Sequence, residues 1–116
     1  MTSAKTFQFT VGQAQVSQTF TCTNGATTPG QSVYAVGSAP QLGAWSPASD
    51  VKLDPTAYPT WIGTISGLPP STSIEWKCIK RQEANHPATA DQWQPGANSS
   101  FTTPSTGPAR GTSGGF

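Results

Sequence analysis

Charge is scarce in this sequence: only 9% of its 116 residues are charged, and six Lys or Arg against five Asp or Glu leave a net charge of +1. Because it has no basic run, the chain lacks the electrostatic footprint of a nucleic-acid binder. No apolar stretch approaches the length of a membrane span, and the first residues, MTSAKTFQ, lack the apolar core of a signal peptide. We therefore expect no nucleic-acid and no membrane partner, and a chain that is either intracellular or excised from a larger protein.

Metal ligands and helix formers are scarce as well. Cys22 and Cys78 are the two cysteines, neither lies in a CxxC pair, and His86 is the single histidine. A zinc site is therefore not expected, nor is any cofactor. The chain is instead rich in Ser, Thr, Gly (12) and Pro (11), a composition that favours short strands joined by turns over long helices.

Several short segments alternate apolar and polar residues, as β-strands do. They lie between turn signals, over residues 15–22, 32–37, 50–54, 60–65, 73–81 and 99–103. This spacing indicates an all-β fold, an antiparallel β-sandwich (immunoglobulin-like, an open-sided barrel) of seven or eight strands. The domain is expected over residues 13–104, after a linker or edge strand over residues 1–12 and before a flexible tail over residues 105–116.

The alternation also orients the cysteines. Successive side chains of a strand point to opposite faces, so Cys22 shares a face with Phe20, and Cys78 shares one with Ile74 and Trp76. Both cysteines then point inward and are able to meet. We favour a disulfide over two unpaired core thiols, because the composition looks like that of a secreted protein. In the chain-entropy model such a bridge contributes about 3–4 kcal/mol.

Four tryptophans have to be placed in this small chain. Trp76 lies on the inward face of its strand, and Trp61 is also expected in the core, although Tyr58 just before it could extend an exposed shelf. Trp45 and Trp93 lie in the loops QLGAWSP and DQWQPGANSS. Each is either folded onto the core as a lid or displayed to water for a partner, since full exposure of an indole is costly.

A sugar site is one use for displayed tryptophans. Lys77 is the outward neighbour of Trp76, and the amides of Gln94 and Asn98 follow Trp93 along the chain. Aromatic faces suit the axial C–H groups of a pyranose ring, while nearby polar groups suit its hydroxyls, and each stack should be worth on the order of 1 kcal/mol. The alternative for Lys77 is an ordinary solvated lysine.

The run VYAVGSAPQLGAWSP, followed by PTWIGTISGLP, EWKCIKR and QWQPGANSSFTTP, strongly resembles the family-20 starch-binding domains over residues 14–104. Within that family these segments look closest to the domain of bacterial amylases that form maltotetraose or related malto-oligosaccharides. The resemblance implies a first glucan site made of Trp45, Lys77, Trp93 and Asn98. Gln94 stands in place of the usual acidic residue and can still hydrogen-bond through its amide.

The resemblance implies a second glucan site less completely. One of its tyrosines falls on Pro29, which removes a stacking platform. Tyr58 is a candidate for the other tyrosine, with Trp61 close behind it. A second site is therefore expected to be weak, altered or absent.

The function implied is that of a non-catalytic module, excised from a larger glycoside hydrolase (an exo-amylase), that binds α-1,4-glucan chains and targets the attached enzyme to starch granules. Its expected partners are starch, amylose, malto-oligosaccharides, cyclodextrins and the tethered catalytic domain, in a secreted and monomeric protein.

Three other functions are alternatives to starch binding. The low charge speaks against a single-stranded nucleic-acid binder. A small hydrolase would have to use Asp50 and Asp54 as its carboxylate pair, but these two residues bracket a strand and fit a solvated edge better, and His86 has no nucleophile motif near it. A purely structural sandwich module is the remaining alternative.

Overall fold

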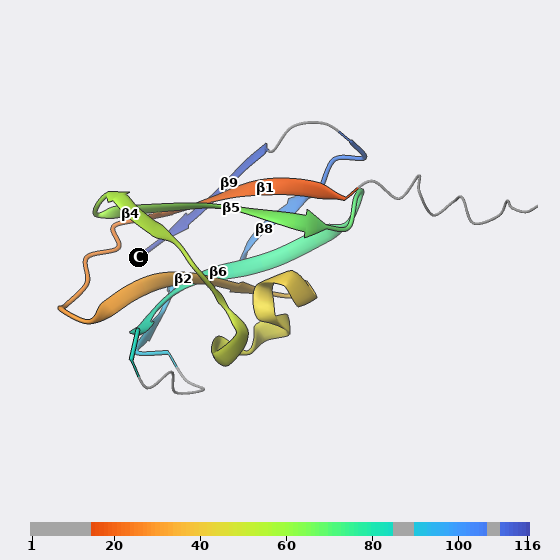
Figure 1. The fold of residues 1–116 in the computed structure, drawn as a ribbon. Coiled ribbons are helices and arrows are strands. Elements are labelled where there is room, and N and C mark those ends of the chain that lie inside the picture. Colours follow the sequence, from red (N-terminus) through yellow and green to blue (C-terminus); the bar gives the residue numbers. More distant parts are fainter. Residues whose placement is uncertain (1–14, 85–89, 107–109) are drawn as a thin grey trace, which may run out of the picture.

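The protein folds as two β-sheets that pack face to face (Figure 1). The structure is a computed structural model that describes residues 15–84, 90–106 and 110–116; the expected linker or edge strand over residues 1–12, and His86, lie outside these residues. The described strands are β1 (Val16–Thr23), β2 (Gln31–Gly37), β3 (Val51–Lys52), β4 (Asp54–Ala57), β5 (Thr60–Leu68), β6 (Ser73–Gln82), β7 (Gln92–Trp93), β8 (Ser99–Thr102) and β9 (Arg110–Gly115). Two short 3₁₀ helices, η1 (Pro40–Trp45) and η2 (Pro47–Ser49), follow β2. Neither is long or apolar enough to cross a membrane, and the described ranges hold no other helix that is.

The two sheets have different strand orders. Sheet A runs β4-β5-β1-β9, and sheet B runs β3-β2-β6-β7, with β8 also paired to β6. The pairings are antiparallel except for β1 with β9, which is parallel. The predicted all-β, mainly antiparallel sandwich is confirmed. Nine strands are described instead of seven or eight, because strands as short as β4 and β7 carry no readable alternation.

The main core lies between the sheets and is built on aromatic rings. Phe20 of β1 meets Trp76 of β6 edge to face, with ring centroids 4.8 Å apart, and meets Phe101 of β8 at 5.4 Å. A disulfide between Cys22 and Cys78 joins β1 to β6 across the core. The inward orientation predicted for both cysteines, their bridge, and the core position of Trp76 are thereby confirmed.

The C-terminal segment corrects one prediction. Residues 110–116 were expected to belong to a flexible tail, but Arg110–Gly115 form β9, which pairs with β1 along its length. Phe116 packs against the main core, and the ammonium of Lys80 lies 4.6 Å from its ring centre. The sequence RGTSGG resembles a linker because five of its six residues are Gly, Ser or Thr, whereas strand pairing needs only the backbone.

The outer side of sheet B is covered by a smaller second cluster. Tyr34, Val36 and Ile79 are buried there, with Ala90 packed against them. Arg81 also lies under this cover, and its guanidinium forms an ion pair with Asp50 in which the two side chains are 0% and 2% exposed. Asp50 is therefore not the solvated edge residue expected from its charge, because it has a buried cationic partner. Asp54 is exposed, as expected.

Candidate glucan-binding site

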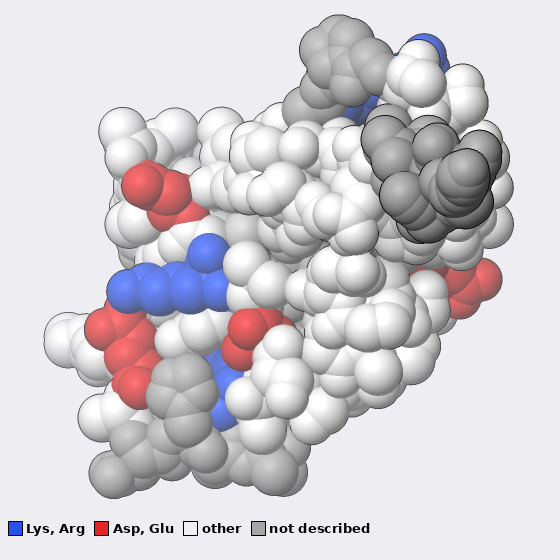
Figure 2. Space-filling model, turned by 45° about the vertical axis from the view of Figure 1, so that its right-hand side comes forward, with Lys and Arg blue, Asp and Glu red and all other residues white. Residues whose placement is uncertain are grey.

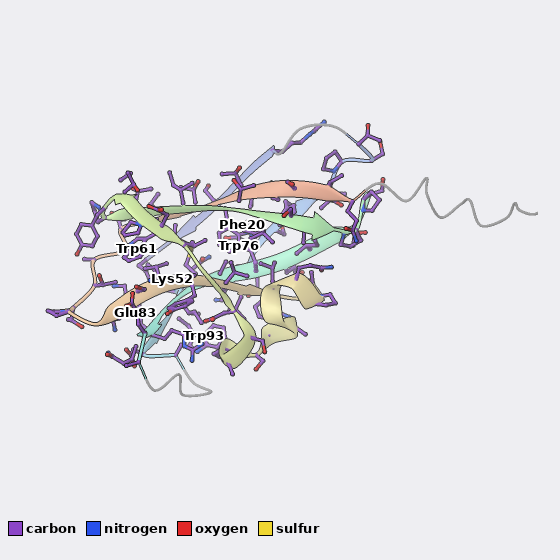
Figure 3. All side chains as sticks on the ribbon, viewed as in Figure 1. Phe20, Lys52, Trp61, Trp76, Glu83 and Trp93 are labelled. Atoms are coloured by element: carbon purple, nitrogen blue, oxygen red, sulfur yellow. A yellow bond between two sulfur atoms is a disulfide. The ribbon has the colours of Figure 1, made fainter. Side chains whose placement is uncertain are left out.

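Strand β6 sets the direction in which the candidate residues point. Ile74, Trp76 and Cys78 face the main core, so Lys77 between them projects from the outer side of sheet B. Trp93 of β7 pairs directly with Ile79 of β6, and paired residues share a face. Lys77 and Trp93 thus lie on the same outer side of sheet B. Figure 3 shows Trp93 beyond sheet B, with Phe20 and Trp76 between the sheets.

The loop that follows Trp93 is fastened to β6 by side-chain hydrogen bonds. The ammonium of Lys77 donates to the carbonyl oxygens of Gln94, at 2.9 Å, and Gly96, at 2.5 Å. The amide nitrogen of Asn98 donates to a carboxylate oxygen of Glu75 at 2.8 Å. These contacts fasten the loop of residues 94–98, which follows Trp93, to β6 at Glu75 and Lys77. Glu75 was missed by sequence reasoning, although its outward phase beside Lys77 was available as a signal.

Gln94, which the sequence suggested as a contact for the sugar, is buried. The residue is only 6% exposed. Its side-chain oxygen accepts the backbone N–H of Cys78 at 3.0 Å, and its amide nitrogen donates to the hydroxyl of Ser99 at 3.1 Å. The polar group that the sequence offered to a sugar is therefore turned toward the protein, where it supports the loop.

Trp45 is carried by a tight turn between η1 and η2. Gly43, Ala44 and Trp45 have positive φ angles of 84°, 50° and 67°, which costs a non-glycine residue about 1–3 kcal/mol. A Cβ atom on Gly43 would lie 2.6 Å from the carbonyl oxygen of Ser49, so the two helices meet backbone to backbone. Such a conformation persists only where the surrounding structure imposes it.

Both loop tryptophans are displayed to solvent. Trp45 is 37% exposed and Trp93 is 40% exposed. Most indoles bury nearly all of their surface, as Trp61 and Trp76 do at 3% and 0%. Of the two interpretations left open by the sequence, the structure therefore supports display over a lid on the core.

The protein carries few charges, since only 9% of its residues are charged. No pocket is found in the described residues, nor any group of three or more His, Cys, Asp or Glu placed to hold a metal. Figure 2 shows a face of the molecule that is mostly white, with few blue and red side chains. Lys52 forms an ion pair with Glu83 at 2.9 Å, and the pKa of Glu83 is lowered by hydrogen bonds from the hydroxyl of Ser32 and from Lys52. Glu83 is therefore charged at neutral pH and balances Lys52.

The candidate second site is built around the turn between β4 and β5. Tyr58 is 51% exposed, and its hydroxyl oxygen accepts the backbone N–H of Thr27 at 3.1 Å. Trp61 is 3% exposed, and its indole N–H donates to the carbonyl oxygen of Gly25 at 2.7 Å. Trp61 thus occupies the core position that was favoured for it. In the tentative second site it supports the turn from beneath and presents no face to a sugar, while Pro29 is exposed in the neighbouring loop.

An all-β sandwich with few charges that displays two loop tryptophans to solvent has the features of a carbohydrate-binding module. The family model for the starch-binding domain matches residues 15–112, and the chain therefore belongs to the starch-binding domain family, whose members are non-catalytic binding domains.

Curated relatives include whole enzymes. The chain is 55% identical over 90 residues to a glucan 1,4-alpha-maltotetraohydrolase of Stutzerimonas stutzeri, covering 77% of this chain and 16% of that one. It is 46% identical over 93 residues to a cyclomaltodextrin glucanotransferase of Klebsiella oxytoca, covering 80% of this chain and 14% of that one. The chain thus spans about a seventh of the length of these relatives.

Solved structures share the fold. The family 20 carbohydrate-binding module of a maltotetraose-forming amylase from Pseudomonas saccharophila superposes with a TM-score of 0.78 at 48% identity, covering 87% of this chain and all of that one. A glucoamylase from Hypocrea jecorina superposes with a TM-score of 0.68 at 28% identity, over 85% of this chain and 17% of that one.

Proposed function

We propose that this starch-binding domain binds α-1,4-glucan chains by stacking glucose rings on Trp45 and Trp93. The observation that supports the proposal is the exposure of both indoles: Trp93 on the outer side of sheet B, where Lys77 also projects, and Trp45 at the end of η1. An exposed indole is costly unless a partner covers it, and its flat face suits the C–H face of a pyranose.

Lys77 and Asn98 supply the hydrogen bonds that fix the orientation of the chain. An ammonium has three donors, and two of those of Lys77 hold the loop, which leaves one for a sugar hydroxyl. The carbonyl oxygen of the Asn98 amide is a second possible partner, because its nitrogen is the atom bound to Glu75. Gln94 acts through the loop backbone and not by contact with the glucan.

The affinity should be modest because the platform is open and buries little of a ligand. For a short malto-oligosaccharide we expect a Kd of about 10 μM to 1 mM. Starch, amylose and cyclodextrins present the same glucose rings and are expected to use the same platform. Tyr58 forms a weaker second contact, which matters where two points of one domain reach neighbouring chains of a granule.

The relatives suggest what the domain serves. They are an amylase and a glucanotransferase several times longer than this chain, so we propose that the domain is joined to an amylolytic catalytic domain and holds it at starch outside the cell. The module itself is expected to act as a monomer. A nucleic-acid ligand is not favoured, because a net charge of +1 gives little attraction for phosphates.

The test is adsorption to raw starch, with cellulose and chitin as controls. Wild type should be retained by starch alone, and Trp45→Ala and Trp93→Ala should each be retained less. Ile62→Ala is the matched control, because Ile62 is 39% exposed but lies on β5 of the other sheet. Equal retention of all four proteins would reject the proposed site, and equal retention by cellulose would reject the proposed ligand.

A further inference from the structure

A buried ion pair at η2, the helix that follows Trp45 in the chain, has no part in the glucan contacts proposed above. Arg81 Nη1 lies 3.1 Å from Asp50 Oδ1, with the two side chains 0% and 2% exposed. The same nitrogen donates to the carbonyl oxygen of Pro47, and the guanidinium lies 5.4 Å from the centre of the Tyr34 ring. Buried ion pairs often add no more stability than apolar residues of similar volume would. A gain in stability therefore does not explain the pair, and the segments that it joins have to be considered.

The ion pair joins β6 to η2, the short helix that begins two residues after Trp45. Pro47 is the first residue of η2 and Asp50 is its C-terminal cap. Arg81 therefore contacts both ends of this short helix from β6, and Nη1 of its guanidinium makes both contacts. Before Trp45, the corresponding anchor is Leu42 of η1, which is fully buried in the main core.

Trp45 thus lies between two anchors, in a backbone conformation that needs them. Positive φ angles at Ala44 and Trp45 persist only where neighbouring structure imposes them. Within the turn itself the N–H of Ser46 donates to the carbonyl oxygen of Gly43 at 2.9 Å, but this contact is local and would move with the turn. The fixed reference on the C-terminal side is Arg81 on the central strand of sheet B.

We infer that Arg81 and Asp50 are positioning residues, which clamp η2 so that the Trp45 indole stays displayed in the orientation that stacks on glucan. The inference rests on the proposed function and adds to it two residues that never touch the sugar. It predicts that loss of the ion pair weakens glucan binding only while Trp45 is present.

The experiment removes both charges together, as Arg81→Met with Asp50→Leu, so that neither is left buried alone. Calorimetry with maltoheptaose is run well below the unfolding temperature, in the wild-type background and in Trp45→Ala. The expected result is a Kd weaker by about five- to tenfold in the wild-type background, with no further weakening in Trp45→Ala. The matched control is Lys52→Met with Glu83→Gln, which removes an exposed ion pair of sheet B, with side chains 53% and 44% exposed, and should leave Kd unchanged.

Two results would overturn the inference in a variant that unfolds cooperatively: an unchanged Kd, or an equal weakening in both backgrounds. If the double variant does not fold, Asp50→Asn decides instead, since it keeps the side-chain shape and an acceptor oxygen for Arg81. We then expect a Kd weaker by about two- to threefold that again depends on Trp45, and an unchanged Kd would contradict the clamp. If Trp45→Ala itself binds like wild type, the proposed glucan site fails, which is a different result from failure of the clamp alone.

Discussion

The outer side of sheet B and the turn between β4 and β5 both display aromatic rings, but the two regions differ in the contacts that support these rings. Trp93 lies on the outer side of sheet B and Trp45 ends η1, and hydrogen bonds of Lys77 and Asn98 together with the buried Arg81–Asp50 ion pair fasten the neighbouring segments to β6. At the turn a single phenol is displayed, and the tryptophan behind it is buried. We therefore expect the main glucan contacts at Trp45 and Trp93, because two displayed indoles can stack on two glucose rings of one chain, whereas the turn displays a single ring.

The largest effect is expected when both displayed indoles, Trp45 and Trp93, are removed. In the double variant Trp45→Ala and Trp93→Ala, we expect maltoheptaose to bind at least about 30-fold more weakly, since each stack contributes about 1–3 kcal/mol. Calorimetry measures this, with Ile62→Ala as the control for loss of an exposed apolar side chain. Binding within a few-fold of wild type would show that the glucan lies elsewhere.

The next effect is expected at Lys77, which joins the platform to its supporting loop. Lys77→Met removes the donors to the Gln94 and Gly96 carbonyl oxygens while keeping most of the apolar stem. We expect a Kd weaker by about three- to tenfold, because hydrogen bonds to charged groups contribute about 1.5–3 kcal/mol and water replaces part of them. Lys52→Met serves as the control, and a variant that binds as wild type does would show that the loop needs no support from Lys77.

A smaller effect on soluble glucan is expected at the turn. Tyr58→Ala should weaken maltoheptaose binding by less than about threefold but reduce adsorption to starch granules, where two weak contacts on one rigid domain reinforce each other. Tyr58→Phe keeps the ring and loses only the oxygen that accepts the N–H of Thr27. It should therefore adsorb nearly as wild type does. If Tyr58→Ala abolishes soluble binding while Trp93→Ala leaves it intact, the order of the two sites is reversed.

The smallest effect is expected from salt. Raising the ionic strength from about 50 to about 500 mM should change the Kd for maltoheptaose by less than about twofold, because the glucan is neutral and salt screens only charges. A nucleic-acid ligand would show a steep loss of affinity over the same range. Parallel titrations with maltoheptaose and a single-stranded oligonucleotide therefore separate the two functions.

The features that the sequence predicted well are those governed by alternation along a strand. Strand β6 placed Trp76 and Cys78 inward and Lys77 outward, and from this the core, the disulfide and one member of the site all followed. The resemblance to starch-binding domains added the residues that lie in loops, where alternation gives no direction.

The features that escaped prediction depend on contacts between distant segments. The segment that forms β9 has small residues that resemble a linker, and only the available edge of β1 makes it a strand. Asp50 looked like a surface residue because its partner, Arg81, is far away in the sequence. The sequence predicts a ligand contact for Gln94 because its amide follows a displayed tryptophan. In the structure its side-chain oxygen accepts a hydrogen bond from the backbone N–H of Cys78.

The most direct test of the central claim follows the indole N–H groups of all four tryptophans at once, in a ¹⁵N-labelled sample titrated with maltoheptaose. The indoles of Trp61 and Trp76 are internal controls, because they donate within the protein to the Gly25 carbonyl oxygen and to the Thr112 hydroxyl. The account predicts that the Trp45 and Trp93 signals move together with one Kd while the Trp61 and Trp76 signals stay in place. Movement of the Trp61 signal, with Trp45 and Trp93 unaffected, would contradict it.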